Sequence, residues 1–579
     1  MYDLLLTNGT VVDGTGAPAF AADVAVKDGR IVALHRRHDR GDDHRHDRGD
    51  DRADGAAVRV VDVSGRCVSP GWVDFHGHAD WTCLDHPAAL NLLIQGCTLT
   101  VAGNCGLAPG PVGGPGAALL ARGEGRGYHA PAIAAMTRRH PDLEWGLGDF
   151  LAAVEDSRPG VNYVQLAGHN RIRQTVLGHA PRAATGAEVR RMGELVAAGL
   201  DEGAFGLTSG LVYIPGCWAE PDELVALARV VARRDGYYAT HIRGERETNV
   251  EATRELVETA ERAGVRANVS HMQSKWPVFG NGPLKVEMLD AARARGVDLS
   301  CDYEIYNKNS ATLGSFLQIY HYTPAQLVAL LSTASGREGL KRTMRETGPR
   351  HPLGRFGPGG VAHSGDWDRV VVWGCPHDRA LEGMSLAAVA AERGVDAEDA
   401  LFDLTLAEGG AGPKLIYDYI QDEHEQIVPW EQCVLPSVDT GLFDPAAASA
   451  GGGASLQPLD FRYQLDTGAP SPIGMFPRVL GQYVRDEGLL TLEEGVRRMT
   501  TLPLSRLGIA DRGTVRPGMW ADLVVFDPQR IAMRAPDADP DRPETCWPVG
   551  IDYVVVNGAV AVEGQRATGV RAGRVLRRA

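Results

Sequence analysis

The sequence predicts an α/β protein in which a (β/α)8 barrel of the TIM type is joined to a small β-sandwich built from both ends of the chain. Short apolar stretches alternate with amphipathic helical stretches through the middle of the chain, as in parallel strands joined by helices. Both ends show short apolar runs separated by turn residues, as antiparallel strands do. With 579 residues, of which 44% are hydrophobic, the chain can fill a large core.

The two ends are expected to pair with each other. Residues 1–66 and residues 509–579 each contain only two or three strand-like runs, and such small pieces are marginal alone. Pairing them into one sandwich leaves residues 67–508 for the barrel. An insertion at 36–54 repeats the motif HDRGDD and is expected to be a solvated hairpin tip or a disordered loop, rather than a metal site.

The middle of the chain supplies the eight strands that a barrel needs, and the active site is expected at their carboxyl ends. The predicted strands are 72–78, 98–104, 161–168, 204–208, 237–241, 267–271, 297–302 and 433–439. Helices are expected over 222–236 and 245–264, the second ended by Gly264. Long stretches at about 314–370 and 446–454 interrupt the pattern and are candidate substrate lids.

Charge and composition favour a small-molecule substrate. The net charge of -15 argues against a nucleic acid or an anionic membrane as partner, because an acidic surface repels polyanions. No leader-like segment and no long apolar stretch is present, so we expect a cytoplasmic protein with reduced cysteines. The sequence does not indicate an oligomeric state.

Four predicted strands end in residues that bind metals. His76 and His78 lie two positions apart, so both imidazoles point to the same side of their strand. Cys105, His241 and His271 follow or close three other strands. Any of them alone is more often a packed core residue, but their shared position at strand ends favours a metal site. A thiolate with imidazoles selects a metal such as Zn²⁺ over Mg²⁺ or Ca²⁺.

Asp439 ends the last predicted strand. A carboxylate there is able to take a proton from a water molecule at the metal and pass it to a leaving nitrogen. An aspartate before Thr440 and Gly441 is often only a turn residue. Beside four metal-binding strand ends, the catalytic interpretation is preferred.

The motifs GWVDFHGHAD, GNCG, GAFGLTSGLVYIPG, THIRGE, SHMQ and MFPRVLGQYVR occur in this order, and the chain resembles the D-aminoacylase branch of the amidohydrolase superfamily over nearly its whole length. The resemblance implies a zinc-dependent amidohydrolase that deacylates an N-acylated amine or amino acid. It further implies a tight zinc site at Cys105, His241 and His271, a weaker or second metal site at His76 and His78, and Asp439 as catalytic base and acid. His169 is a candidate for holding the oxyanion.

The chain departs from this family where the substrate carboxylate is expected to bind. Gln273 stands where the family has a lysine, and Glu304 stands where it has a tyrosine. Ser310 is a candidate remnant of the carboxylate site, and Lys275 or Arg243 are alternative cations. Because a buried carboxylate needs charge-assisted partners, these changes favour an N-acyl amine without a carboxylate near the scissile bond, such as Nε-acyl-lysine.

Two rival functions stay open. Cyclic amidases resembling hydantoinase and dihydroorotase share the barrel and the HxH opening, but the GNCG motif and the lack of a strand-end lysine argue against them. A non-catalytic binding barrel would be expected to lose metal ligands or Asp439, and the sequence keeps all of them.

Overall fold

Parallel strands form the middle of the protein in the computed structural model, which describes residues 1–36, 57–126, 129–276, 278–305, 308–311, 313, 316, 323–346, 361–418, 423–444, 473–534 and 547–578. One sheet has the order β6-β7-β8 and another the order β17-β13-β12-β11-β10-β9. Every predicted barrel strand is present, and the predicted strand 161–168 is divided into two. The bounds are β6 Trp72–Asp74, β7 Cys97–Ala102, β8 Asn162–Gln165, β9 Ala167–Gly168, β10 Gly206–Gly210, β11 Tyr237–His241, β12 Arg266–Val269, β13 Leu299–Glu304 and β17 Cys433–Ser437.

Backbone hydrogen bonds join the two parallel sheets at both edges. On one side, the Leu166 amide donates to the Ala102 carbonyl at 2.8 Å and the Phe205 amide to the Gln165 carbonyl at 3.0 Å. On the other side, the Asp439 amide donates to the His76 carbonyl at 2.7 Å. The carboxyl ends of β6 and β17 therefore lie side by side.

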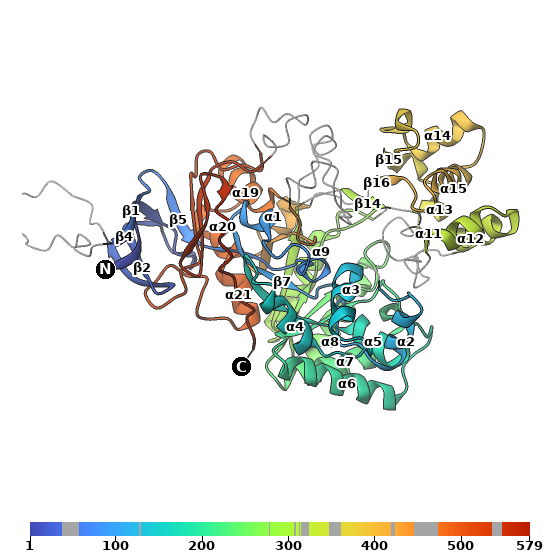
Figure 1. Ribbon diagram of the computed structural model, residues 1–579, viewed down its shortest axis with the longest axis horizontal. Coiled ribbons are helices and arrows are strands. Elements are labelled where there is room, and N and C mark those ends of the chain that lie inside the picture. Colours follow the sequence, from blue (N-terminus) through green and yellow to red (C-terminus); the bar gives the residue numbers. More distant parts are fainter. Residues whose placement is uncertain are drawn as a thin grey trace, which may run out of the picture.

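Helices connect the parallel strands and pack around them (Figure 1). Their bounds are α4 Leu147–Asp156, α5 His169–Leu177, α6 Gly186–Asp201, α7 Pro221–Ala232, α8 Asn249–Ala263, α9 Gly282–Ala294, α20 Leu492–Met499 and α21 Thr501–Leu507. Gly264 ends α8 as predicted, with a φ of 68° that glycine adopts without strain. The helix begins four residues later than predicted, at Asn249, so Glu245 lies in the loop that follows β11.

Strands from both ends of the chain form one nine-stranded sheet, with the order β21-β20-β19-β18-β5-β1-β2-β3 and β4 paired to β1. The N-terminal strands are β1 Tyr2–Val11, β2 Phe20–Lys27, β3 Arg30–Arg36, β4 Ala57–Asp62 and β5 Cys67–Pro70. The C-terminal strands are β18 Leu523–Phe526, β19 Ile551–Val556, β20 Ala559–Glu563 and β21 Arg566–Ala567. The HDRGDD repeat at 36–54 lies outside the described residues, apart from Arg36.

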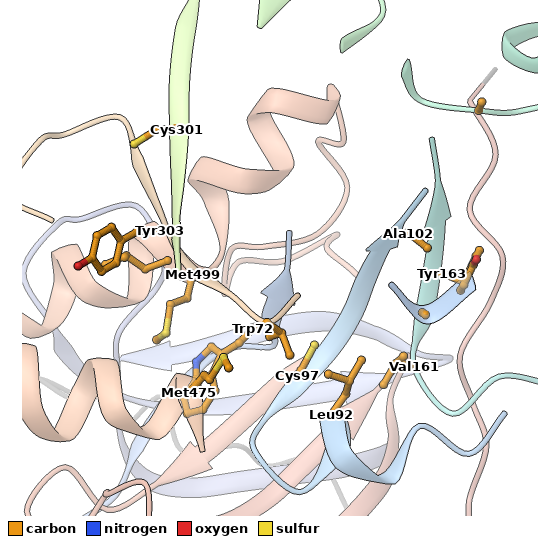
Figure 2. Packing of buried hydrophobic residues seen from close by; sticks show 14 of the residues in the cluster. Trp72, Leu92, Cys97, Ala102, Val161, Tyr163, Cys301, Tyr303, Met475 and Met499 are labelled. Carbon is orange, nitrogen blue, oxygen red and sulfur yellow. The ribbon is translucent and has the colours of Figure 1, made fainter. Parts of the chain in front are cut away.

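The main core lies where the parallel strands meet the C-terminal helices. Trp72 is fully buried and stacks on Phe476 with ring centroids 5.9 Å apart. Figure 2 shows Met475 and Met499 beside Trp72, and Cys97 and Leu92 on its other side. Aromatic and aliphatic side chains thus fix the first strand of the barrel region against the segment that follows the last one.

A separate subdomain is inserted between β13 and β17 (Figure 1). Its small sheet has the order β14-β16-β15, with β14 Lys308–Ala311, β15 Val370–Gly374 and β16 Lys414–Asp418, and its main helices are α11 Pro324–Leu331, α12 Ala334–Glu346, α14 Leu386–Arg393 and α15 Ala397–Ala407. It has its own cluster of buried side chains from Leu313 to Tyr417. The inserted subdomain therefore extends well past residue 370, the predicted end of the insertion. The prediction falls short because the later strands and helices of the subdomain have the same sequence pattern as the barrel units.

None of the helices among the described residues is both long and apolar enough to cross a lipid bilayer. The predicted loop at 446–454 lies outside the described residues.

Candidate metal centre

Two groups of metal-binding side chains meet at the carboxyl ends of the parallel strands, and Cys105 belongs to both. In the first, the donor atoms of His76, His78, Cys105 and Asp439 all lie within 4.8 Å of one another. In the second, the same holds for Cys105, His241 and His271. All the residues predicted to bind metal, together with Asp439, thus lie in one place.

The distances from the sulfur of Cys105 to three imidazoles suit metal coordination. Its Sγ atom lies 3.3 Å from His76 Nε2, 3.5 Å from His241 Nδ1 and 3.6 Å from His271 Nε2. Sulfur and nitrogen bound to one tetrahedral zinc ion at ordinary bond lengths lie about 3.6 Å apart. Cys105 with His241 and His271 therefore has sulfur–nitrogen separations that suit one zinc ion, while His76 lies near the same sulfur as a member of the other group.

Three of these residues have left-handed backbones. The φ angles are 54° for Cys105, 36° for His271 and 48° for Asp439. Residues with a Cβ adopt this region at a cost of order 1–3 kcal/mol, and such strain concentrates at functional sites. Each bend turns a side chain into the space at the strand ends.

The electrostatics of the centre favour a thiolate and a carboxylate. Burial opposes ionisation of Cys105, but the adjacent His76, His241 and His271 lower the pKa of its thiol well below the usual value. Burial likewise opposes ionisation of Asp439, yet His78 and His76 hold its pKa well below the ordinary range. Both groups are therefore deprotonated and able to act as acceptors.

His78 and Asp439 form a close pair. The His78 Nε2 atom lies 3.0 Å from Asp439 Oδ1. The imidazole of His78 also stacks on Trp81, with ring centroids 4.2 Å apart and planes 13° from parallel. This stacking fixes the ring that faces the carboxylate.

Two acidic residues that the sequence analysis did not select lie behind the imidazoles. Asp302, at the end of a predicted strand, is 1% exposed, and its oxygens accept from the His271 amide at 2.8 Å and lie 3.2 Å from His76 Nδ1. Glu245 lies 3.3 Å from both His241 Nε2 and His271 Nδ1. Asp302 ends a predicted strand, as the predicted metal-binding residues do. Glu245 lies in a segment that the sequence pattern predicts as a helix, and the helix begins only at Asn249.

Glu304 and Gln273 are buried beside the centre. The carboxyl group of Glu304 hydrogen-bonds to that of Asp439, and burial together with Asp439 raises the pKa of Glu304 well above its usual value. The Gln273 side-chain amide donates to the main-chain oxygen of Glu304. Ser310 lies in β14, where side chains are not among those described.

The other three candidates each contact a carboxylate. Lys275 Nζ lies 2.6 Å from Glu245 Oε1. Arg243 is paired with Glu255 at 2.7 Å. His169 Nε2 lies 2.8 Å from Glu223.

A further cation, which the sequence analysis passed over, lies near Glu304. Arg478 donates to the main-chain oxygen of Ile305 and, at 2.7 Å, to the side chain of Gln482. It belongs to the MFPRVLGQYVR motif. Its nearness to the centre depends on the fold and could not be read from the sequence.

Comparison with known proteins identifies similar chains over the full length. A model described as "Amidohydrolase family" matches residues 59–312 and 460–562. An N-acyl-D-glutamate deacylase of Alcaligenes xylosoxydans xylosoxydans is 32% identical over 582 residues, which cover 100% of this chain and 96% of that protein. The crystal structure of a D-aminoacylase superposes with a TM-score of 0.72 at 29% identity, and covers 100% of both chains.

A second similar solved structure contains a metal. It is an N-acyl-D-glutamate deacylase from Bordetella bronchiseptica in complex with zinc and a phosphonate that mimics the tetrahedral intermediate. The TM-score is 0.71 at 31% identity, again over 100% of both chains.

Proposed function

The chain belongs to the amidohydrolase family and is a hydrolase of linear N-acyl amide bonds, and from that premise we propose that it deacylates an N-acylated amine at a zinc centre. Zinc is held by Cys105, His241 and His271, and His76 and His78 supply a second, weaker site. The centre stands at the mouth of a closed (β/α)8 barrel. The hydrogen bonds that join the two parallel sheets at both edges support the closure.

The observation that carries the proposal is the position of His241 Nδ1 and His271 Nε2, which lie 3.5 and 3.6 Å from Cys105 Sγ. His76 Nε2, in the other group, lies 3.3 Å from the same sulfur. Thiolate and imidazole together suit zinc, and the full-length neighbour from Bordetella bronchiseptica was solved with zinc. When bound, zinc would lower the pKa of a water molecule and polarise the amide carbonyl.

Asp439 is the proposed proton carrier. Its carboxylate accepts the proton of the attacking water and then donates it to the departing nitrogen. His78, at 3.0 Å, keeps the carboxylate ionised before the reaction. The left-handed backbone of Asp439, with a φ of 48°, aims the side chain into the centre.

His169 is the proposed partner of the oxyanion. Its Nε2 atom is engaged by Glu223 at 2.8 Å. Its Nδ1 atom is buried and has no hydrogen-bond partner among the described residues. Because the Glu223 carboxylate accepts from Nε2, the Nδ1 atom donates to an oxyanion only when the imidazole carries both hydrogens. A buried polar atom without a partner costs free energy, so an oxyanion that accepts from Nδ1 in that form binds more tightly.

The leaving amine is proposed to lack a carboxylate next to the scissile bond, as in Nε-acyl-lysine. Gln273 and Glu304 occupy the positions at which the D-aminoacylase family binds that carboxylate, and neither can supply a positive charge. The candidate cations Lys275 and Arg243 are each already paired with a glutamate. Asp439, which stays ionised beside the buried Glu304, would repel a second carboxylate.

A kinetic comparison tests both parts of the proposal. The zinc-loaded enzyme is assayed with N-acetyl-D-methionine, Nε-acetyl-lysine and hydantoin. Hydrolysis of either linear amide, with hydantoin untouched, supports the linear amidase over the cyclic one. A kcat/KM that strongly favours N-acetyl-D-methionine would reject the assignment of the leaving amine, and inertness toward every amide would favour a binding protein.

A further inference from the structure

We infer that Glu245 and Lys275 form a positioning pair that orients His241 and His271 toward the metal, and that Lys275 acts through Glu245 rather than on substrate. This inference rests on the metal centre of the proposed function. Glu245 is not among the site residues predicted from the sequence. Lys275 is predicted there as a cation for a substrate carboxylate, and here it is a positioning residue instead.

The pair links two neighbouring strand-end loops. His241 closes β11 and Glu245 follows it by four residues, while His271 follows β12 and Lys275 comes four residues after it. Lys275 Nζ lies 2.6 Å from Glu245 Oε1, and the Lys275 amide donates to the Glu245 carbonyl at 3.3 Å. Two contacts between the same two residues therefore fix the separation of the loops that carry the two histidines.

Glu245 faces the outer nitrogens of both imidazoles. Its Oε2 lies 3.3 Å from His241 Nε2, and its Oε1 lies 3.3 Å from His271 Nδ1. The inner nitrogens, Nδ1 of His241 and Nε2 of His271, lie 3.5 and 3.6 Å from Cys105 Sγ. The two rings thus present opposite nitrogens to the metal position, and both outer nitrogens converge on one carboxylate.

This arrangement selects the tautomer that binds metal. A carboxylate only accepts hydrogen bonds, so each outer nitrogen that faces it carries the hydrogen. The inner nitrogen is then left with its lone pair, which is what a zinc ligand needs. One carboxylate therefore sets the tautomer of both histidines.

Lys275 stabilises the buried negative charge of Glu245. Glu245 is 2% exposed and Lys275 is 3% exposed, so neither charge is well solvated. A buried charge is stable only when it is paired, and the ammonium group at 2.6 Å supplies the pairing. The charge of Lys275 is thereby offset within the protein and is a poor partner for a substrate carboxylate.

Metal affinity tests the inference without any substrate. Zinc affinity is measured by chelator competition for the wild type, Glu245→Gln, Lys275→Met and the double variant. The Gln side chain has one acceptor oxygen and accepts a hydrogen bond from only one imidazole, so we expect zinc affinity to fall about 10–100-fold. Lys275→Met should also weaken zinc binding, and should add little to the loss in the Glu245→Gln background because the two residues act as a unit.

The spectrum of the cobalt-substituted protein gives a second readout. A change in the d–d and thiolate-to-cobalt bands of Glu245→Gln would report altered ligand geometry. Lys341→Met is the matched control, since it removes a nearly buried lysine paired with Asp396 and Asp399 in the inserted subdomain. The control should keep both the spectrum and the zinc affinity of the wild type.

Zinc affinity within twofold of the wild type in Glu245→Gln would overturn the inference. So would a Lys275→Met variant that binds zinc normally and only raises KM, because that result marks a substrate contact. If either single variant does not fold, the double variant, which leaves no unpaired charge, gives the same test of zinc affinity. A protein that binds zinc as expected and hydrolyses no amide would reject the proposed function while leaving this inference intact.

Discussion

Asp439 Oδ1 lies 3.0 Å from His78 Nε2, and the Asp439 amide donates at 2.7 Å to the carbonyl of His76. The end of the last parallel strand is thereby tied by both main chain and side chain to the end of the first. The candidate proton carrier is thus held against the HxH motif, although more than 350 residues separate the two in the sequence.

Replacement of this carboxylate should separate catalysis from metal binding. In Asp439→Asn the side chain keeps its size but no longer accepts a proton, so we expect kcat to fall by at least about a hundredfold. Zinc held by Cys105, His241 and His271 should remain at wild-type content, measured by atomic absorption. Unchanged turnover in this variant would remove Asp439 from the mechanism.

Cys105 should be essential for the metal but not for the fold. Cys105→Ala and Cys105→Gly both remove the thiolate, so we expect both to lose zinc. At a φ of 54°, glycine is free of the strain that alanine keeps, so metal-free Cys105→Gly should be more stable than metal-free Cys105→Ala by about 1 kcal/mol. Urea denaturation measures this difference, and equal stabilities would show that the backbone relaxes when the thiol is removed.

Restoring the residues of the D-aminoacylase family should change substrate preference. In Gln273→Lys/Glu304→Tyr, a buried cation and a phenol become available to a substrate carboxylate. We expect kcat/KM for N-acetyl-D-methionine relative to Nε-acetyl-lysine to rise about tenfold or more, equivalent to about 1.4 kcal/mol. Zinc content serves as the control for an intact centre, and an unaltered ratio would mean that these two positions do not select the amine.

Lys285 should make stability depend on pH in the alkaline range. It is fully buried, its ammonium donates to the Met272 carbonyl at 2.8 Å, and burial lowers its pKa from 10.5 to about 8. Between these values the unfolded chain binds the proton and the folded chain does not, so stability rises with pH, by up to about 3 kcal/mol.

The comparison with Lys285→Met isolates this effect from other titrating groups. The free energy of unfolding of the wild type minus that of Lys285→Met should increase from pH 8 to pH 10.5 and stay constant below pH 7. A difference that does not vary with pH would show that Lys285 keeps its proton in the fold.

Much of the centre could be predicted because strand ends leave a local signal. His76, His78, Cys105, His241, His271 and Asp439 each follow an apolar run, and parallel strands bring such positions together. Glu245 was missed because its neighbourhood has the pattern of a helix, while the chain there forms a loop that turns the carboxylate toward the histidines. The sequence also predicts too short an inserted subdomain. Its strands β15 and β16 resemble barrel strands in sequence, and they differ in that they pair antiparallel with each other.

The most direct test of the account is metal reconstitution followed on a linear N-acyl substrate. The protein is stripped with a chelator, zinc is returned in steps, and hydrolysis of Nε-acetyl-lysine and N-acetyl-D-methionine is measured at each step. We predict that activity toward at least one of the two is absent from the stripped protein and is restored as the Cys105, His241 and His271 site fills. Full hydrolysis by the metal-free protein, or none by the zinc-loaded protein, would contradict the account.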